Sequence, residues 1–173
     1  MRIAGIEYDD IANGAGIGVA VFVQGCAHHC KGCHNPKTWD FTGGKEFKES
    51  DLDDVVNYFE QNPFATRLTI TGGDPLHDVN LTEVFEFILR FKQKLPNIAI
   101  WIYSGYTWEQ VLEQYATGIQ RRALVISVCD VFVDGEFDIK KRDVTLQFRG
   151  SSNQRVIDVR KTVVANKIIL WGE

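Results

Sequence analysis

The sequence has few of the features that would divide the chain, export it or place it in a membrane. It contains four prolines in 173 residues, and no repeat, low-complexity tract or Pro/Ser-rich linker separates one part from another. No apolar run approaches the roughly 18 residues of a membrane span. Acidic residues at Glu7, Asp9 and Asp10 interrupt the N-terminus before a signal-length apolar stretch can form. We therefore expect one cytoplasmic domain, residues 1–173, with no membrane segment.

Cysteine is also scarce, but three of the four cysteines are clustered. Cys26, Cys30 and Cys33 form a C-x3-C-x2-C run, which is typical of metal binding in a reducing compartment and not of a disulfide framework. Thiolates bind zinc and iron–sulfur clusters, and closed sites of both kinds need four protein ligands. Cys129 lies far downstream in an apolar run that predicts a buried strand, so we interpret it as a core residue. Three ligands leave one position open, which favours a reactive centre.

Other readings of the cysteine run remain open. Cys30-Lys-Gly-Cys33-His34 matches the pattern of covalent haem attachment, although that normally accompanies export. A thioredoxin-like redox pair would leave Cys26 unexplained. A structural zinc site could use the three thiolates with one histidine.

The charge distribution is not typical of a nucleic-acid-binding protein. The net charge is −4, and the basic residues gather toward the C-terminus without interleaved aromatic residues that would stack on bases. We expect neither direct nucleic-acid binding nor a membrane partner.

Strand-like and helix-like patterns alternate along the chain. Strands are expected at 18–23, 67–71, 98–103 and 124–128. Helices are expected to start at Ser50, at Asn80 with a capping box to Glu83, and at Thr107 with a capping box to Gln110. This alternation predicts an α/β fold with a parallel sheet and helices on the outside. A complete eight-stranded barrel needs about 250 residues, so the chain would form at most an open, partial (β/α) barrel.

Three segments follow the carboxyl ends of expected strands, where parallel sheets bind ligands. They are the cysteine run, Gly72-Gly73-Asp74-Pro75 and Ser104-Gly105-Tyr106, and all three should lie on one rim. Glycines without a Cβ at 72 and 73 would let the backbone approach a ligand closely. The alternative is an ordinary tight turn between strand and helix.

Together these features resemble the radical S-adenosylmethionine enzymes. Within that superfamily the chain is similar to the branch that activates glycyl-radical enzymes, in particular anaerobic ribonucleoside-triphosphate reductase. The similarity extends from about residue 11 to residue 158 and rests on the cysteine run and on Asn13-Gly14, Phe22 to Cys26, Gly32 to Asn35, Thr38-Trp39, Gly72 to Leu76, Trp101, Gly105-Tyr106, Val133 to Gly135 and Arg149 to Arg155.

The resemblance implies a cofactor set, a reaction and partners. Cys26, Cys30 and Cys33 would hold one 4Fe-4S cluster whose open iron binds S-adenosylmethionine. Reductive cleavage would give a 5′-deoxyadenosyl radical that removes hydrogen from a glycine of the reductase. An electron donor such as a flavodoxin would supply electrons to the cluster, and the resemblance implies a homodimer within a hetero-oligomer. A radical enzyme acting on a small molecule, or on another glycyl-radical enzyme, and a non-catalytic zinc or redox-cluster module are the alternatives.

The resemblance also assigns cofactor contacts by position. Gly32, Cys33, His34 and Gly73 match places where the family meets S-adenosylmethionine, and Gly72 and Asp74 complete the glycine motif. Valine at position 73 is therefore expected to clash with the cofactor and to leave the iron content intact.

Two segments raise questions that the sequence leaves open. The family often reads Asn-Gly-Pro-Gly-x-Arg before the cysteine strand, but here alanine stands at 15 and glycine at 18. Either Arg2 or Lys31 is a candidate replacement for the missing arginine. The polar segment 149–155 either docks the reductase or caps the open barrel.

Overall fold

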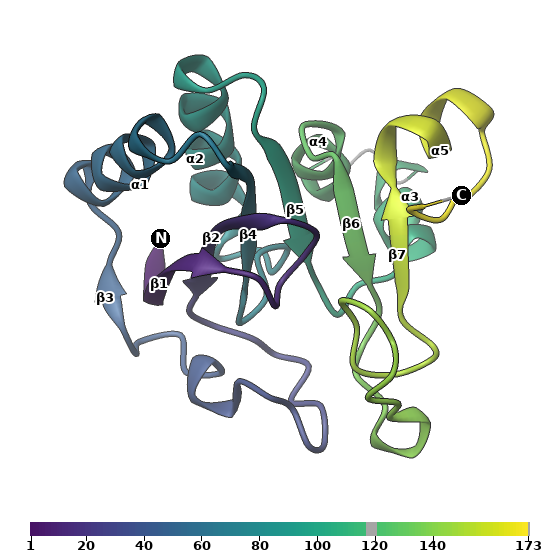
Figure 1. The fold of residues 1–173 in the computed structure, drawn as a ribbon. Helices are drawn as coiled ribbons and strands as arrows, with labels where there is room; N and C mark the ends of the chain where they lie inside the picture. The colour runs from purple at the N-terminus through teal and green to yellow at the C-terminus, as the bar shows by residue number, and fades with distance from the viewer. Residues whose placement is uncertain (117–120, 173) are drawn as a thin grey trace.

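The computed structural model describes residues 1–116 and 121–172, and the strands of this part of the chain form a seven-stranded sheet (Figure 1). The strand order is β3-β1-β2-β4-β5-β6-β7. The strands are β1 (Arg2–Asp10), β2 (Ile17–Val23), β3 (Lys45–Glu46), β4 (Ala65–Gly72), β5 (Ala99–Tyr103), β6 (Val131–Asp134) and β7 (Arg155–Asp158).

The sheet is mixed, so the prediction of a purely parallel sheet was wrong. β2, β4, β5 and β6 are parallel neighbours, whereas β1 runs antiparallel to β2 and β7 antiparallel to β6. The alternation of strands and helices reveals only the parallel centre, because the outer strands return without a helical crossover. The strand order is that of an open sheet, and a barrel is not confirmed.

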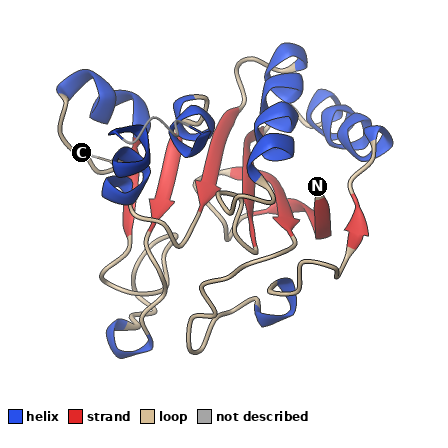
Figure 2. Ribbon diagram, turned by 180° about the vertical axis from the view of Figure 1, so that it is seen from behind, coloured by secondary structure: helices blue, strands red, loops and turns tan. Residues whose placement is uncertain are grey.

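Helices lie between the parallel strands, and one more helix follows β7. They are α1 (Glu49–Gln61), α2 (Leu81–Lys94), α3 (Trp108–Ala116), α4 (Arg121–Ser127) and α5 (Val159–Ala165), with short 3-10 turns at Pro36–Thr38 and Ile139–Lys141. Figure 2 shows the same helices from behind. In the described residues no helix combines the length and the hydropathy needed to cross a membrane.

The structure confirms one of the three predicted helix caps in full. Thr107 and Gln110 form the expected capping box, with reciprocal bonds of 2.8 and 3.3 Å. Helix α1 begins at Glu49 behind Lys48, so Ser50 is not its cap. Asn80 does precede α2, but its side chain makes no capping bond there, and Glu83 pairs with the amino group of Met1. The amide of Asn80 instead donates to the Gln24 and Asp74 carbonyls, because the tertiary structure offers it these acceptors.

The strand predicted at 124–128 was wrong, because α4 occupies most of it. A short apolar run does not distinguish a strand from a buried helix. The buried side chains are Arg122, Val125 and Ile126, at helical spacing, whereas Leu124 is exposed. Cys129 follows the helix and is 2% exposed, as expected of a core residue.

The two faces of the central strands carry different chemistry. Leu68 and Ile70 of β4 belong to one continuous apolar core with buried residues of α1, α2 and α4. Successive side chains of a strand point to opposite faces, so Arg67, Thr69 and Thr71 lie on the other face. The opposite face is therefore polar at β4, and it borders the cavity described below.

One ion-pair group fastens the end of β6 to neighbouring elements. Arg155 at the start of β7 donates to both carboxylate oxygens of Glu109 at 2.9 and 2.7 Å, and also to the buried Asp134. Hydrogen bonding to Arg155 lowers the pKa of Glu109 to about 2. The group thus joins α3, β6 and β7 beside the cavity.

This lowered pKa makes stability depend on pH. Because the folded-state pKa of Glu109 lies below its ordinary value of 4.5, its contribution is present above pH 4.5 and is lost as the pH falls toward 2. In metal-free protein, Glu109→Gln should lower the free energy of unfolding by about 0.5–1 kcal/mol at pH 7, since the carboxylate is largely exposed. The difference from wild type should vanish near pH 2. Glu113→Gln, an exposed change on the same helix, is the control, and a pH-independent difference for Glu109→Gln would contradict the pairing.

Candidate metal centre

The cysteine loop leaves the sheet at the carboxyl end of β2. The Gly25 and Cys26 amides donate to the Thr38 and Trp39 carbonyls at 2.8 and 3.2 Å, so the loop returns on itself. Within it the Cys33 amide donates to the Cys30 carbonyl, and the Asn35 amide donates to the Cys33 sulfur at 3.3 Å. Hydrogen bonds of its own backbone therefore fix the shape of this loop, which carries the three thiols at the carboxyl end of β2.

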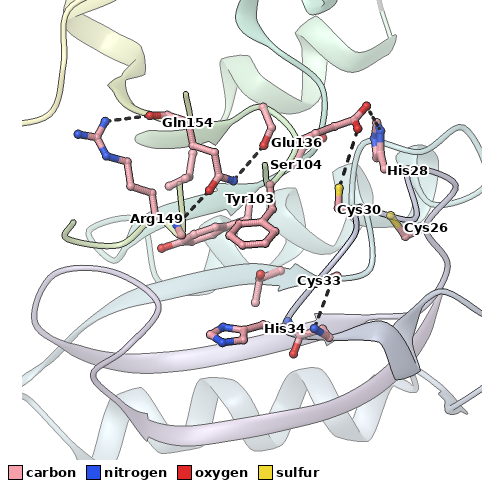
Figure 3. Close-up of a pocket in the computed structure, with 18 of the residues that line it drawn as sticks. Cys26, His28, Cys30, Cys33, His34, Tyr103, Ser104, Glu136, Arg149 and Gln154 are labelled. Atoms are coloured by element: carbon pink, nitrogen blue, oxygen red, sulfur yellow. Dashed lines mark hydrogen bonds and ion pairs between the residues drawn. The ribbon is translucent and has the colours of Figure 1, made fainter. Parts of the chain in front are cut away.

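The loops after β2, β4, β5 and β6 converge on one cavity of about 730 Å³ (Figure 3). Figure 1 shows the long segments after β2 and β6 extending from the same end of the sheet. The expectation that three segments share one rim is confirmed. The cavity lining includes Cys26, Cys30, Cys33, Gly32, His34, Gly72, Gly73, Ser104 and Gly105.

The three thiols differ in environment. Cys26 is buried, and burial raises the pKa of its thiol to about 11. Cys30 is half-buried, and burial raises the pKa of its thiol as well. A thiol with a raised pKa becomes a ligand only when a metal provides the compensating positive charge.

The donor set fits an iron–sulfur cluster, because cysteine thiolates are the usual protein ligands of such clusters. In the described residues, no three His, Cys, Asp or Glu side chains are grouped closely enough to hold one metal ion. In a four-iron cluster each thiolate binds a different iron, so the ligands need not meet at one point. Cys129 precedes β6, at the end of the sheet away from the cysteine loop, and it does not line the cavity. The fold thus brings three cysteines to the site and leaves the fourth in the core.

The cavity also has room and polar groups for a small organic cofactor. Its volume is in the range of roughly 300–1,000 Å³ that small-molecule sites occupy. The buried hydroxyl of Tyr103, a lining residue, has no hydrogen-bond partner among the described residues. Next to the thiols, the chain therefore offers space and backbone groups for a bound molecule.

The glycine pair has a structural requirement of its own. Gly72 has φ +100°, and a Cβ there would lie 2.8 Å from the Val23 oxygen. A Cβ on Gly73 would lie 2.5 Å from the Gly25 oxygen, immediately before Cys26. The expectation that a side chain at 73 would clash first with the cofactor is therefore corrected: it meets the cysteine loop itself.

Asp74 is placed behind the cavity wall. Its carboxylate is 1% exposed and accepts from the Leu76 amide at 2.8 Å, the Ser104 hydroxyl at 2.7 Å and the Gly105 amide at 3.3 Å. The remaining partner is His28 of the cysteine loop, at 2.6 Å. Asp74 thus joins the three rim loops to one another, and it does not line the cavity.

Comparison with known proteins also indicates an iron–sulfur protein, and the matches cover most of the chain. Residues 12–157 match the family model described as a 4Fe-4S single cluster domain. The anaerobic ribonucleoside-triphosphate reductase-activating protein of Pasteurella multocida is 38% identical over 146 residues, which cover 84% of this chain and 89% of that protein. The chain belongs to this family. The Escherichia coli K12 protein of the same name is 34% identical over 87% of this chain and 94% of its own length, and that of phage T4 is 31% identical over 85% and 87%.

The sequence analysis did not predict a role in the site for His28 or Glu136. His28 bridges Asp74 and Glu136, with its Nδ1 3.0 Å from the Glu136 carboxylate, and Glu136 also approaches the Cys30 sulfur at 3.9 Å (Figure 3). Hydrogen bonding to Asp74 raises the pKa of His28. Glu136 comes from the loop after β6, more than one hundred residues away from His28, so no local spacing signals the contact.

The segment after β6 forms a wall of the cavity. Gln154 accepts from the Gly150 and Ser151 amides at 3.0 and 3.1 Å and donates to the Gly135 carbonyl at 2.9 Å. Arg149 donates to the Gln154 carbonyl (Figure 3). Much of segment 149–155 is therefore engaged in shaping its own loop, which favours the interpretation that it caps the open side of the sheet.

Proposed function

We propose that this protein is a radical S-adenosylmethionine enzyme that generates the glycyl radical of anaerobic ribonucleoside-triphosphate reductase. The observation that carries the proposal is the placement of three cysteines, without a fourth, on the rim of a cavity that a small cofactor can enter. The names of the family members supply the reductase as the protein substrate. We propose that residues 1–173 act as one domain in the cytoplasm and receive electrons from a donor such as a flavodoxin.

Cys26, Cys30 and Cys33 would hold a 4Fe-4S cluster with one iron left open for S-adenosylmethionine. When bound, this cluster would supply the electron that cleaves the sulfonium to methionine and a 5′-deoxyadenosyl radical, which takes a hydrogen atom from the target glycine. The backbones of Gly32, Gly72 and Gly73 and the side chain of His34 line the cavity where the cofactor would lie. Asp74 would act from behind, through the hydrogen bonds that align the rim loops.

The chain would also keep solvent from the reaction. The wall formed after β6 brings Phe137, Ile139 and Phe148 to the cavity, with Phe137 and Ile139 close to Gly32. An apolar wall beside the cofactor limits quenching of a reactive radical by other groups. The cavity is open on one side, which favours a loop of a partner protein over an enclosed small molecule as the hydrogen donor.

Anaerobic reconstitution tests the proposal. Protein loaded with iron and sulfide and then reduced should show a cluster spectrum that changes on addition of S-adenosylmethionine and should release 5′-deoxyadenosine. Addition of the reductase should yield a glycyl radical detectable by electron paramagnetic resonance. A cluster that ignores the cofactor, or bound zinc, would favour the non-catalytic module, and 5′-deoxyadenosine without a protein radical would favour another substrate.

A further inference from the structure

A buried arginine outside every motif discussed above organises one wall of the cavity. Arg67 of β4 is 1% exposed, and its side chain lies on the polar face of the sheet. Its guanidinium donates to the carbonyls of Asp10, the last residue of β1, and of three residues in the loop between β1 and β2, at distances from 2.7 to 3.4 Å: Asn13, Ala15 and Gly16. A planar group with five donors suits such a set of converging acceptors.

The same loop is held by a carboxylate that pairs with Arg67. Asp10 is 6% exposed, and its Oδ2 accepts from Arg67 at 2.7 Å. Its oxygens also accept from the Ala12 amide, the Asn13 amide and the Asn13 side chain at 3.2, 3.2 and 2.8 Å. The Asn13 carbonyl accepts a further bond of 2.7 Å from the hydroxyl of Thr69. Ala12 and Asn13 line the cavity, so this network places a wall of the site.

The register of the sheet explains why the arginine is on β4. Gly18 of β2 pairs directly with Arg67, and paired residues of adjacent parallel strands share a face. A Cβ on Gly18 would lie 2.0 Å from the Arg67 carbonyl oxygen and 3.1 Å from its Cβ. Position 18 is where the resemblance calls for an arginine. The two earlier candidates are engaged or placed elsewhere: Arg2 binds the Gly43 and Gly44 carbonyls, and Lys31 is exposed.

We propose that Arg67 replaces, from the neighbouring strand, the arginine missing at position 18, and that it is the positioning residue for the Asn13 wall of the cavity. Its hydrogen bonds in the described residues end on positions 10–16 and 69 and not on the cysteine or glycine loops. Thr69, which anchors Asn13, precedes Gly72 by three residues, or about 10 Å of strand. Because these bonds do not reach the loops that carry the cysteines and glycines, loss of Arg67 would affect the transfer of hydrogen from the target glycine more than cluster assembly or cofactor cleavage. This second half rests on the proposed function.

Arg67→Met tests both halves, with Arg122→Met as the matched control for the exchange measurement. Arg122 is also a buried arginine, 5% exposed, but it binds the Leu76 carbonyl, Asp78 and the Tyr106 hydroxyl and does not contact the Asn13 loop. Amide hydrogen exchange of metal-free protein should accelerate about tenfold or more in a peptide spanning residues 10–17 in Arg67→Met only. Reconstituted Arg67→Met should keep its iron and form 5′-deoxyadenosine, but the glycyl radical formed per 5′-deoxyadenosine should fall about tenfold or more, because small misplacements of reacting groups are costly.

Two results would overturn the proposal: unchanged exchange at residues 10–17, or a normal ratio of glycyl radical to 5′-deoxyadenosine. If Arg67→Met does not fold, Arg67→Lys retains the charge beside Asp10 but cannot reach four carbonyls, and the same two readouts apply. Failure of the proposed function is seen separately, since wild-type protein would then yield no 5′-deoxyadenosine or no glycyl radical. The hydrogen-exchange measurement uses metal-free protein, so it does not depend on formation of 5′-deoxyadenosine or of the glycyl radical.

Discussion

Replacing Cys26, Cys30 or Cys33 with alanine should reduce the iron and sulfide bound after reconstitution to background and abolish 5′-deoxyadenosine formation. Each thiolate would hold one iron of the proposed cluster, and the described residues place no fourth cysteine at the cavity to take over. Loss of a single ligand should therefore prevent assembly rather than weaken it. Iron content, sulfide content and the absorption spectrum measured under anaerobic conditions provide the test.

Cys129→Ala is the matched control for these variants. Its thiol is buried in the core and donates to the Val125 carbonyl at 3.2 Å. Its removal should cost about 1 kcal/mol of unfolding free energy and leave the cluster intact. A variant of Cys26, Cys30 or Cys33 that kept its cluster would remove that residue from the ligand set, and loss of the cluster in Cys129→Ala would indicate a four-cysteine site.

Gly73→Val should lose the cluster together with local structure. The new Cβ would lie 2.5 Å from the Gly25 oxygen and 2.9 Å from its carbonyl carbon, so the backbone before Cys26 must move. Overpacking of this kind costs about 1–3 kcal/mol. Because Gly25 and Cys26 are adjacent, the displacement should reach a ligand, and iron content should fall along with cofactor binding.

Gly5→Val provides a comparison for this change. A Cβ on Gly5 of β1 meets no atom within 4 Å, so the same substitution there should keep both iron and cofactor binding. If Gly73→Val retained full iron content but bound S-adenosylmethionine weakly, the clash would be with the cofactor, as the sequence alone had suggested. Parallel measurements of iron content and cofactor affinity separate the two explanations.

Asp74 shows how a correctly located motif can have a different task from the one first assigned. The segment 72–75 lies at the rim, as the strand pattern predicts, and Gly72 and Gly73 line the cavity. The carboxylate of Asp74 does not line the cavity but bonds to Ser104, Gly105 and His28, which do. Position along the chain predicts which loop a residue occupies, but the direction of its side chain depends on loops that come from elsewhere in the sequence.

The sequence predicted most of the site because its determinants are local. Three thiols within eight residues, glycines after a strand and strands that alternate with helices are all patterns of neighbouring residues, and parallel strands bring their carboxyl ends to one edge. The count of four cysteines and their spacing were sufficient to predict that three cysteines lie together at the cavity and that Cys129 lies in the core. Dependence on local patterns also explains the error at 124–128. A short apolar run is compatible with a strand or a buried helix, and the adjacent sequence does not decide between them.

What the tertiary structure decided involves contacts between distant segments. The antiparallel return of β1 and β7, the clearance between Gly73 and Gly25, and the bridge from His28 to Glu136 join residues that are far apart in sequence. Arg67 reaches a loop more than fifty positions earlier, and only the register of β2 against β4 shows that it stands beside Gly18. The sequence by itself determined that this protein has a 4Fe-4S domain, because the type and spacing of the cysteines are local properties. The tertiary structure decided which residues support that chemistry, because buried polar groups take whatever partners packing brings within reach.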